Sequence, residues 1–209
     1  MALDSDQCYL VLEYCQHGNL FEFLRSDDKY PALSERIRTS FMHDMASGLT
    51  YLHGRDRLHG DMKSLNVLVN GNFHKTCKLT DFDSSMRMRE EGGGSAYGRG
   101  GQTMPWMAVE LFNGAAISTQ ADVWALAIIC WEVATRQAPF EDRDNPRADI
   151  IHHRMPALDP SWPDAWRHVM EAGWCVNPAH RPSAAVMAGL LKHALENNYD
   201  DVVQDEQHV

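Results

Sequence analysis

Apolar and polar positions follow a helical pattern over residues 34–54. Ser34 can cap the first turn through its hydroxyl, and Gly54 suits the end of a helix. Between them, apolar residues recur at steps of three and four, which places them on one helix face. These residues are Ile37, Phe41, Met45, Leu49 and Leu52. The pattern predicts an amphipathic helix with one face on a hydrophobic core.

Strand-like patterns occur at three places. Residues 8–14 form an apolar run with β-branched and aromatic members, which predicts a buried strand. Two shorter runs, 67–69 and 76–80, lie on either side of Asn70 and Gly71, and these two residue types favour tight turns. The two shorter runs therefore predict a β-hairpin.

The remaining patterns are mostly helical. Residues 122–135 are apolar almost all round, which predicts a helix buried on every side at the centre of the domain. Four further helices are expected from caps and apolar stripes. They are 20–25 after Asn19, 145–152 with Pro146 in its first turn, 164–172, and a last helix after Ser183 with the stripe Val186, Met187, Leu190, Leu191 and Leu195. The predicted fold class is mainly α.

Two segments lack a pattern that could support a core. Residues 86–101 are polar and rich in glycine, so we expect a mobile loop there. Residues 199–209 form an acidic end that we expect to fray. A solvated loop explains the first segment, and a regulatory loop beside an active site is the functional alternative.

Composition narrows the class of protein. The chain has 209 residues, enough for one domain with a core. Its net charge of −10 disfavours nucleic acid and anionic membrane surfaces as partners. No apolar run is long enough to cross a bilayer, so we expect no membrane insertion. The 5 scattered cysteines favour reduced thiols and a cytoplasmic location.

A cluster of polar residues follows the 34–54 helix. Asp61, Lys63 and Asn66 lie between a helical pattern and a strand pattern, and Asp81 follows the next strand. Phosphoryl transfer uses such a set: one carboxylate orients a hydroxyl, a lysine offsets charge, and an amide and a second carboxylate hold magnesium. A lone acid before a turn is more often a cap, so the argument depends on the set and its order. The histidines show no zinc-ligand spacing.

The ordered motifs resemble the C-terminal lobe of a protein kinase, closest to the tyrosine-kinase-like serine/threonine group, over about residues 5–197. Residues 59–61, His-Gly-Asp, resemble the kinase H-R-D motif, and residues 81–83, Asp-Phe-Asp, resemble D-F-G. Residues 103–110 resemble the substrate segment that ends in A-P-E. The resemblance implies a protein serine/threonine kinase that uses ATP and Mg²⁺ on a protein substrate.

The resemblance also implies roles for individual residues. Asp61 matches the catalytic base, and Lys63 lies near the transferred phosphate. Asn66 and Asp81 match the metal ligands. Thr103 would contact Asp61 and Lys63, which suits a serine or threonine acceptor.

Further residues match positions that support the site or the nucleotide. His59 and Phe82 belong to the two motifs, Glu110 should pair with Arg181, and Asp122 should accept hydrogen bonds from the catalytic-loop backbone. On the nucleotide side, the resemblance places ATP against four hinge and floor positions. These are Leu12 as gatekeeper, the Glu13 carbonyl, the Cys15 amide and Leu68.

The resemblance divides the chain into three parts. Residues 1–18 match the last N-lobe strand and the hinge, 19–197 the C-terminal lobe, and 198–209 a flexible acidic tail. The glycine loop, the strand lysine and the helix glutamate of the N-terminal lobe have no match in these residues. We therefore expect an apolar upper face, covered by the missing N-terminal lobe or by a partner.

Several residues depart from the kinase pattern. Gly60 replaces the H-R-D arginine, which removes a receiver for a phosphorylated loop. Asp83 replaces the D-F-G glycine and adds a charge beside the metal site. Three effects stay open: higher magnesium affinity, a raised pKa of a neighbouring carboxylate, or a restricted loop. Gln102 and Val109 replace a glycine and a proline and look tolerable. The alternative function is a pseudokinase or interaction module, and we expect little catalysis from these 209 residues alone.

Overall fold

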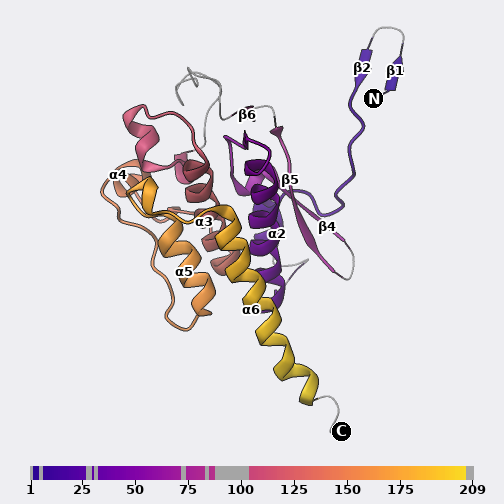
Figure 1. The fold of residues 1–209 in the computed structure, drawn as a ribbon, viewed down its shortest axis with the longest axis vertical. Helices are drawn as coiled ribbons and strands as arrows, with labels where there is room; N and C mark the ends of the chain where they lie inside the picture. The colour runs from indigo at the N-terminus through magenta and orange to yellow at the C-terminus, as the bar shows by residue number, and fades with distance from the viewer. Residues whose placement is uncertain are drawn as a thin grey trace.

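The structure, a computed structural model, describes residues 2–4, 7–26, 30, 33–71, 74–82, 85–87 and 104–205. Most of these residues form a helical lobe, and a short N-terminal hairpin lies apart from it (Figure 1). Some expectations concern residues outside this description: Asp83, most of the 86–101 loop, Gln102 and Thr103.

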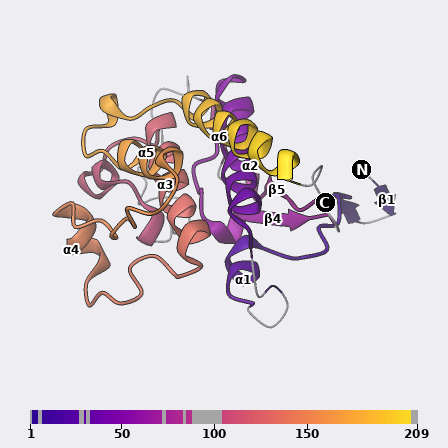
Figure 2. The same cartoon turned by 90° about the horizontal axis from the view of Figure 1, so that it is seen from below.

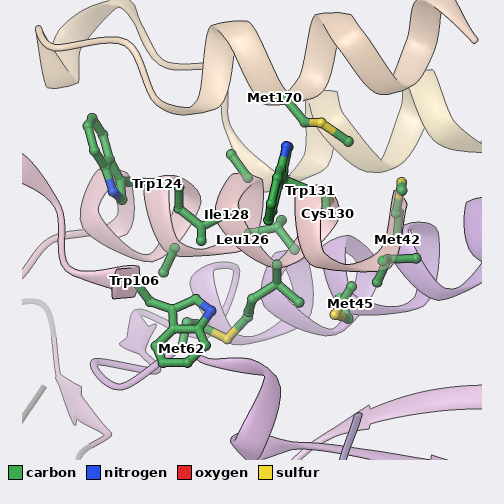
Figure 3. Close-up of a cluster of buried hydrophobic side chains, with 14 of the residues drawn as sticks. Met42, Met45, Met62, Trp106, Trp124, Leu126, Ile128, Cys130, Trp131 and Met170 are labelled. Atoms are coloured by element: carbon green, nitrogen blue, oxygen red, sulfur yellow. The ribbon is translucent and has the colours of Figure 1, made fainter. Parts of the chain in front are cut away.

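Helix α3, Thr119–Thr135, is the centre of the lobe. Its side chains are buried from Ala121 to Ala134, as its apolar sequence predicts. Figure 3 shows these side chains between Met170 on one side and Trp106 and Met62 on the other. The helix begins three residues before the predicted start, because the Ser118 hydroxyl accepts the Ala121 amide hydrogen and caps the first turn.

Helix α2, Glu35–His53, confirms the prediction for residues 34–54. The Ser34 hydroxyl caps it by accepting the Ile37 amide hydrogen, and Gly54 ends it. Helix α6, Ala184–Asp205, lies along α2 in both views (Figures 1 and 2). The shorter helices match their predictions within about two residues. They are α1, Leu20–Leu24; α4, Pro146–Ile151; and α5, Asp164–Gly173.

The strands form three antiparallel pairs. The predicted hairpin is β4, Val67–Asn70, with β5, Thr76–Leu79, and it places Val67 opposite Leu79. The other pairs are β1, Ala2–Asp4, with β2, Gln7–Tyr9, and β3, Arg57–Leu58, with β6, Met86–Arg87. Four 3₁₀ helices complete the described elements. They are η1, Ser64–Asn66; η3, Met104–Trp106; η4, Val109–Asn113; and η5, Pro178–His180.

The prediction of a buried strand at residues 8–14 is wrong. Strand β2 ends at Tyr9, and residues 10–15 have no regular secondary structure. Leu10, Leu12 and Tyr14 are 76%, 69% and 84% exposed, because nothing in the described part of the chain packs over them. Apolar composition therefore predicted burial at a place where the described residues supply no partner strand.

Two details of the last helix also differ from the sequence prediction. Met187 and Leu191 are buried as expected, whereas Val186 is 53% exposed. Helix α6 continues to Asp205, well into the stretch that we predicted as a tail. The flexibility of that end stays a prediction. No helix in the described residues is long and apolar enough to cross a membrane.

Close contact between α5 and α3 depends on Gly173. A Cβ at this position would lie 2.6 Å from the Ala127 Cβ, so Gly173→Ala forces the two helices apart. We expect it to lower the free energy of unfolding by about 1–3 kcal/mol in urea denaturation. Gly189→Ala is the matched control, since a Cβ in α6 meets nothing within 4 Å and should stabilise by about 1 kcal/mol. Equal effects of the two substitutions would contradict this packing.

Candidate active site

The loop after α2 is fixed by a buried carboxylate from α3. One oxygen of Asp122 accepts the His59 amide hydrogen at 2.9 Å and lies 3.0 Å from His53 Nε2. Its other oxygen accepts the Gly60 amide hydrogen at 2.9 Å. Asp122 is 2% exposed, so water competes little for these bonds. The backbone contact that we expected for Asp122 is present.

Gly60 occupies a backbone conformation that suits glycine. Its φ is 80°, in the left-handed region where a side chain costs roughly 1–2 kcal/mol. The backbone amides of His59 and Gly60 both donate to Asp122, and these hydrogen bonds fix the backbone at this position. Glycine in place of arginine at position 60 therefore removes a cation, and it also avoids the backbone strain that a side chain would cause there.

Asp61, Lys63 and Asn66 meet at the end of this loop. Lys63 Nζ lies 2.7 Å from Asp61 Oδ2, and Asn66 Nδ2 donates to the same oxygen at 3.1 Å. Asn66 also donates to the Asp61 carbonyl at 2.9 Å. These contacts hold the Asp61 side chain from two directions. The second carboxylate oxygen has no contact to either residue, so it can accept a hydroxyl proton.

Asp81 follows a strand that is bonded to the same loop. The Thr80 amide donates to the Asn66 carbonyl at 3.0 Å, and His59 Nε2 lies 3.1 Å from the Thr80 carbonyl. The His59 ring also lies 5.5 Å from the Phe82 ring. Asp81 is exposed and has a φ of 62°, a strained conformation of the kind that clusters at functional sites.

The oxygen donors at this site fit magnesium better than zinc. Asn66 offers an amide oxygen, and Asp81 offers an exposed carboxylate on the adjoining strand end. Magnesium usually takes one or two protein oxygens and completes its shell with water and phosphate. Within the described residues, no three His, Cys, Asp or Glu side chains gather as a metal cage.

The predicted Glu110–Arg181 pair is present and buried on the arginine side. Arg181 Nη1 and Nη2 each donate to a Glu110 oxygen at 2.7 Å, which is the bidentate geometry. The guanidinium also donates to the carbonyls of Cys175 and Gln120. It lies 4.8 Å from the centre of the Trp124 ring. This pair fixes the end of the segment that carries η3 and η4.

Sequence reasoning missed a buried carboxylate on α3. Glu132 Oε1 accepts from Arg25 Nη2 at 3.2 Å and from the Ser64 hydroxyl at 2.9 Å, and its Oε2 accepts from Trp106 Nε1 at 2.6 Å. We call these four residues the Glu132 cluster. It links α1, the loop with Asp61 and the η3 segment. Burial raises the pKa of Glu132 to about 7, although the hydrogen bonds from its three donors lower it. In the sequence, this site is marked by one acidic residue, Glu132, within an otherwise apolar helical pattern.

The residues predicted on the nucleotide side are only partly brought together. Residues 17 and 18 bond to β4 through the backbone of Val69, and this places the hinge stretch beside Leu68. The Glu13 side chain reaches Lys78 and Asn70, and the Lys78 ammonium lowers the pKa of Glu13. Cys15 is half-buried, and Leu12 faces solvent. Thr103 lies outside the described residues.

Comparisons with known proteins agree with this geometry. A family model for protein tyrosine and serine/threonine kinases matches residues 1–191. Mitogen-activated protein kinase kinase kinase 13-A of Xenopus laevis is 32% identical over 183 residues, which are 84% of this chain and 18% of that protein. Mitogen-activated protein kinase kinase kinase 7 of Drosophila melanogaster is 32% identical over 201 residues, 91% of this chain and 28% of that protein.

A relative with a different name matches to a similar extent. Receptor-interacting serine/threonine-protein kinase 2 of Bos taurus is 33% identical over 192 residues, 83% of this chain and 35% of that protein. The chain therefore spans only 18% to 35% of the length of these relatives.

Proposed function

The chain belongs to the protein tyrosine and serine/threonine kinase family, and we propose that it transfers the γ-phosphate of ATP to a serine or threonine of a protein substrate. The observation that carries this proposal is the contact of Lys63 and Asn66 with one oxygen of Asp61. One relative is named a serine/threonine-protein kinase and two are named mitogen-activated protein kinase kinase kinases, which favours a serine or threonine acceptor.

Each residue of the loop has a separate task in this proposal. Asp61 orients the acceptor hydroxyl and accepts its proton through the oxygen that its neighbours leave open. Lys63 offsets the negative charge that spreads over the transferred phosphoryl oxygens. The Asn66 amide donates to the carboxylate and to the backbone carbonyl of Asp61 and so fixes its position. We also assign Thr103 to the acceptor side, on the basis of the motif alone.

Magnesium and ATP would bind beside this loop. Asn66 and Asp81 would hold Mg²⁺, which neutralises charge on the phosphates when bound. The backbone of Glu13 and Cys15 would contact the adenine. Leu68 would form the floor of the adenine pocket, and Leu12 would limit its depth. Support for this arrangement comes from the backbone bonds that join residues 17 and 18 to β4.

The division of the chain also belongs to this proposal. We assign 1–18 to the hinge side, 19–197 to a C-terminal lobe and 198–209 to a tail. Residues 10–14 are exposed, and a mostly apolar groove of about 550 Å³ lies between α2 and β5. Both observations favour a further domain or a partner protein that covers this surface. Leu52, Leu79 and Phe82 line this groove. An N-terminal lobe or a partner protein would fill it. The free thiols of the described cysteines agree with the proposed cytoplasmic location.

A pseudokinase is the second candidate, and Gly60 favours it. Without a guanidinium at this position, residues 58–66 contain no arginine to receive a phosphorylated residue. The polar set around Asp61 is intact, so we rank the active enzyme first.

The test is a phosphotransferase assay on the full-length gene product with Mg·ATP and a generic serine/threonine substrate. We expect Asp61→Asn to lower the rate by about a hundredfold or more. Asp56→Asn makes the same chemical change at an exposed turn before the loop and should leave the rate unchanged. Activity that survives Asp61→Asn would sink the catalytic assignment. A wild-type protein without activity would support the pseudokinase.

A further inference from the structure

A second groove lies at the C-terminal end of α3. It has a volume of about 820 Å³, within the range of ligand-binding clefts. The last turns of α3, the loop after it, and the loop between α4 and α5 form its walls. Trp131 in this groove follows Asp122 by nine residues, about 14 Å along the helix.

The floor of the groove is aromatic and held in place. Trp131 and Phe140 are buried, and Trp162 is half-buried. The Trp131 indole donates to the Ala157 carbonyl at 3.1 Å, which joins α3 to the opposite wall. Phe140 keeps a left-handed φ of 60° although it has a side chain, and its carbonyl accepts the Arg143 amide hydrogen at 3.1 Å. The cleft is therefore formed before any ligand arrives.

The rim of the groove is acidic. Glu141, Asp142 and Asp159 line it and are exposed. Arg143 is the one basic residue among the lining residues, and its Nε lies 3.3 Å from Asp142. The hydrogen bonds from Ser161 lower the pKa of Asp159, so that carboxylate stays ionised. Such a groove is complementary to a cation with a flat apolar face, because the acidic rim attracts the charge and the aromatic floor can stack against the flat face.

We propose that this groove, lined by Trp131, Phe140, Glu141, Asp159 and Trp162, docks an arginine-rich segment of a protein partner. Guanidinium groups pair with carboxylates in a fork and stack on aromatic rings, and both partners are present within the same cleft. A second copy of this acidic chain, with a net charge of −10, is disfavoured by repulsion. The proposal rests on the groove alone and does not require phosphoryl transfer.

The test measures binding of a fluorescently labelled, arginine-rich peptide with phenylalanine residues, by anisotropy at physiological salt. The probe should bind the wild-type chain, and a neutral proline-rich peptide of equal length should bind much more weakly. Glu141→Lys with Asp159→Lys reverses the rim and should weaken binding about tenfold or more. Trp162→Ala should weaken it as well, and the Trp162 indole signal in NMR spectra should shift when the peptide is added.

A matched variant separates the groove from general acidity. Glu171→Lys with Glu196→Lys makes the same change in net charge on the exposed surfaces of α5 and α6. This control should change binding by less than about twofold. Circular dichroism establishes that each variant is folded. Equal losses in both double variants, equal binding of the neutral peptide, or no binding to the wild type would overturn the proposal. Self-association that the rim reversal abolishes would overturn it in favour of a second copy.

Discussion

Glu110→Gln lowers the free energy of unfolding by about 3–5 kcal/mol, because it leaves the Arg181 guanidinium charged, fully buried and without a counter-ion. In the wild type, both carboxylate oxygens accept from that guanidinium at 2.7 Å. Glutamine keeps the shape of the side chain but supplies one acceptor and no charge. The carbonyls of Cys175 and Gln120 remain, and they cannot neutralise the cation. Urea unfolding of the purified chain measures the change.

An exposed ion pair in the same chain is the control. Glu196→Gln removes the partner of Lys192 on the surface of α6, where the two charges are 3.7 Å apart. Such i,i+4 pairs contribute about 0.3–0.5 kcal/mol. A loss at Glu110 no larger than the loss at Glu196 would show that the buried pair does not hold the η4 segment. A changed denaturant slope would instead indicate an altered unfolded or native state.

The elements that local patterns specify were predictable from the sequence. The apolar stripe of α2 and its caps, Ser34 and Gly54, depend on residues a few positions apart. The all-apolar run of α3 predicted a helix buried on every side, because any exposed face would need polar residues. The β4–β5 hairpin was also predicted, but its turn was not: Asn70 lies in β4 opposite Thr76, and residues 71–75 connect the strands.

The features that depend on distant parts of the chain could not be read from the sequence. Residues 10–14 have a strand-like composition, but a strand needs a partner, and the described chain places none beside them. The pairing of β3 with β6 joins two-residue strands from distant segments, which no periodicity can predict. The aromatic groove at the end of α3 likewise depends on the contact between Trp131 and a remote loop.

In the candidate site, too, contacts between residues close in sequence were predictable and contacts between distant residues were not. Asp61, Lys63 and Asn66 are close in sequence, so their order alone suggested that they meet. The Glu132 cluster joins Arg25 and Trp106 across a large separation in sequence. Its members are unremarkable in isolation. Only the packing of α1, η1 and η3 against α3 brings three donors to one carboxylate.

The stability of the wild type relative to Glu132→Gln should fall by about 3 kcal/mol as the pH rises from about 4.5 to about 7. Burial raises the pKa of Glu132 from 4.5 to about 7 in the folded chain. Between these values the folded chain keeps a proton that the unfolded chain has lost. Stability therefore decreases with rising pH across this window and levels off above it.

Glutamine at position 132 removes this titration, because its amide does not ionise. The amide nitrogen replaces one of the two oxygens, so it presents hydrogens either to Arg25 and Ser64 or to Trp106, which already donate there. The variant is therefore destabilised by an amount that does not depend on pH. Subtraction of the two unfolding curves at each pH cancels the contribution of every group that the two proteins share. Glu171→Gln, an exposed change on α5, should give a flat difference. A flat difference for Glu132→Gln as well would mean that the carboxylate is already ionised at pH 4.5, held by Arg25, and that burial does not control its pKa.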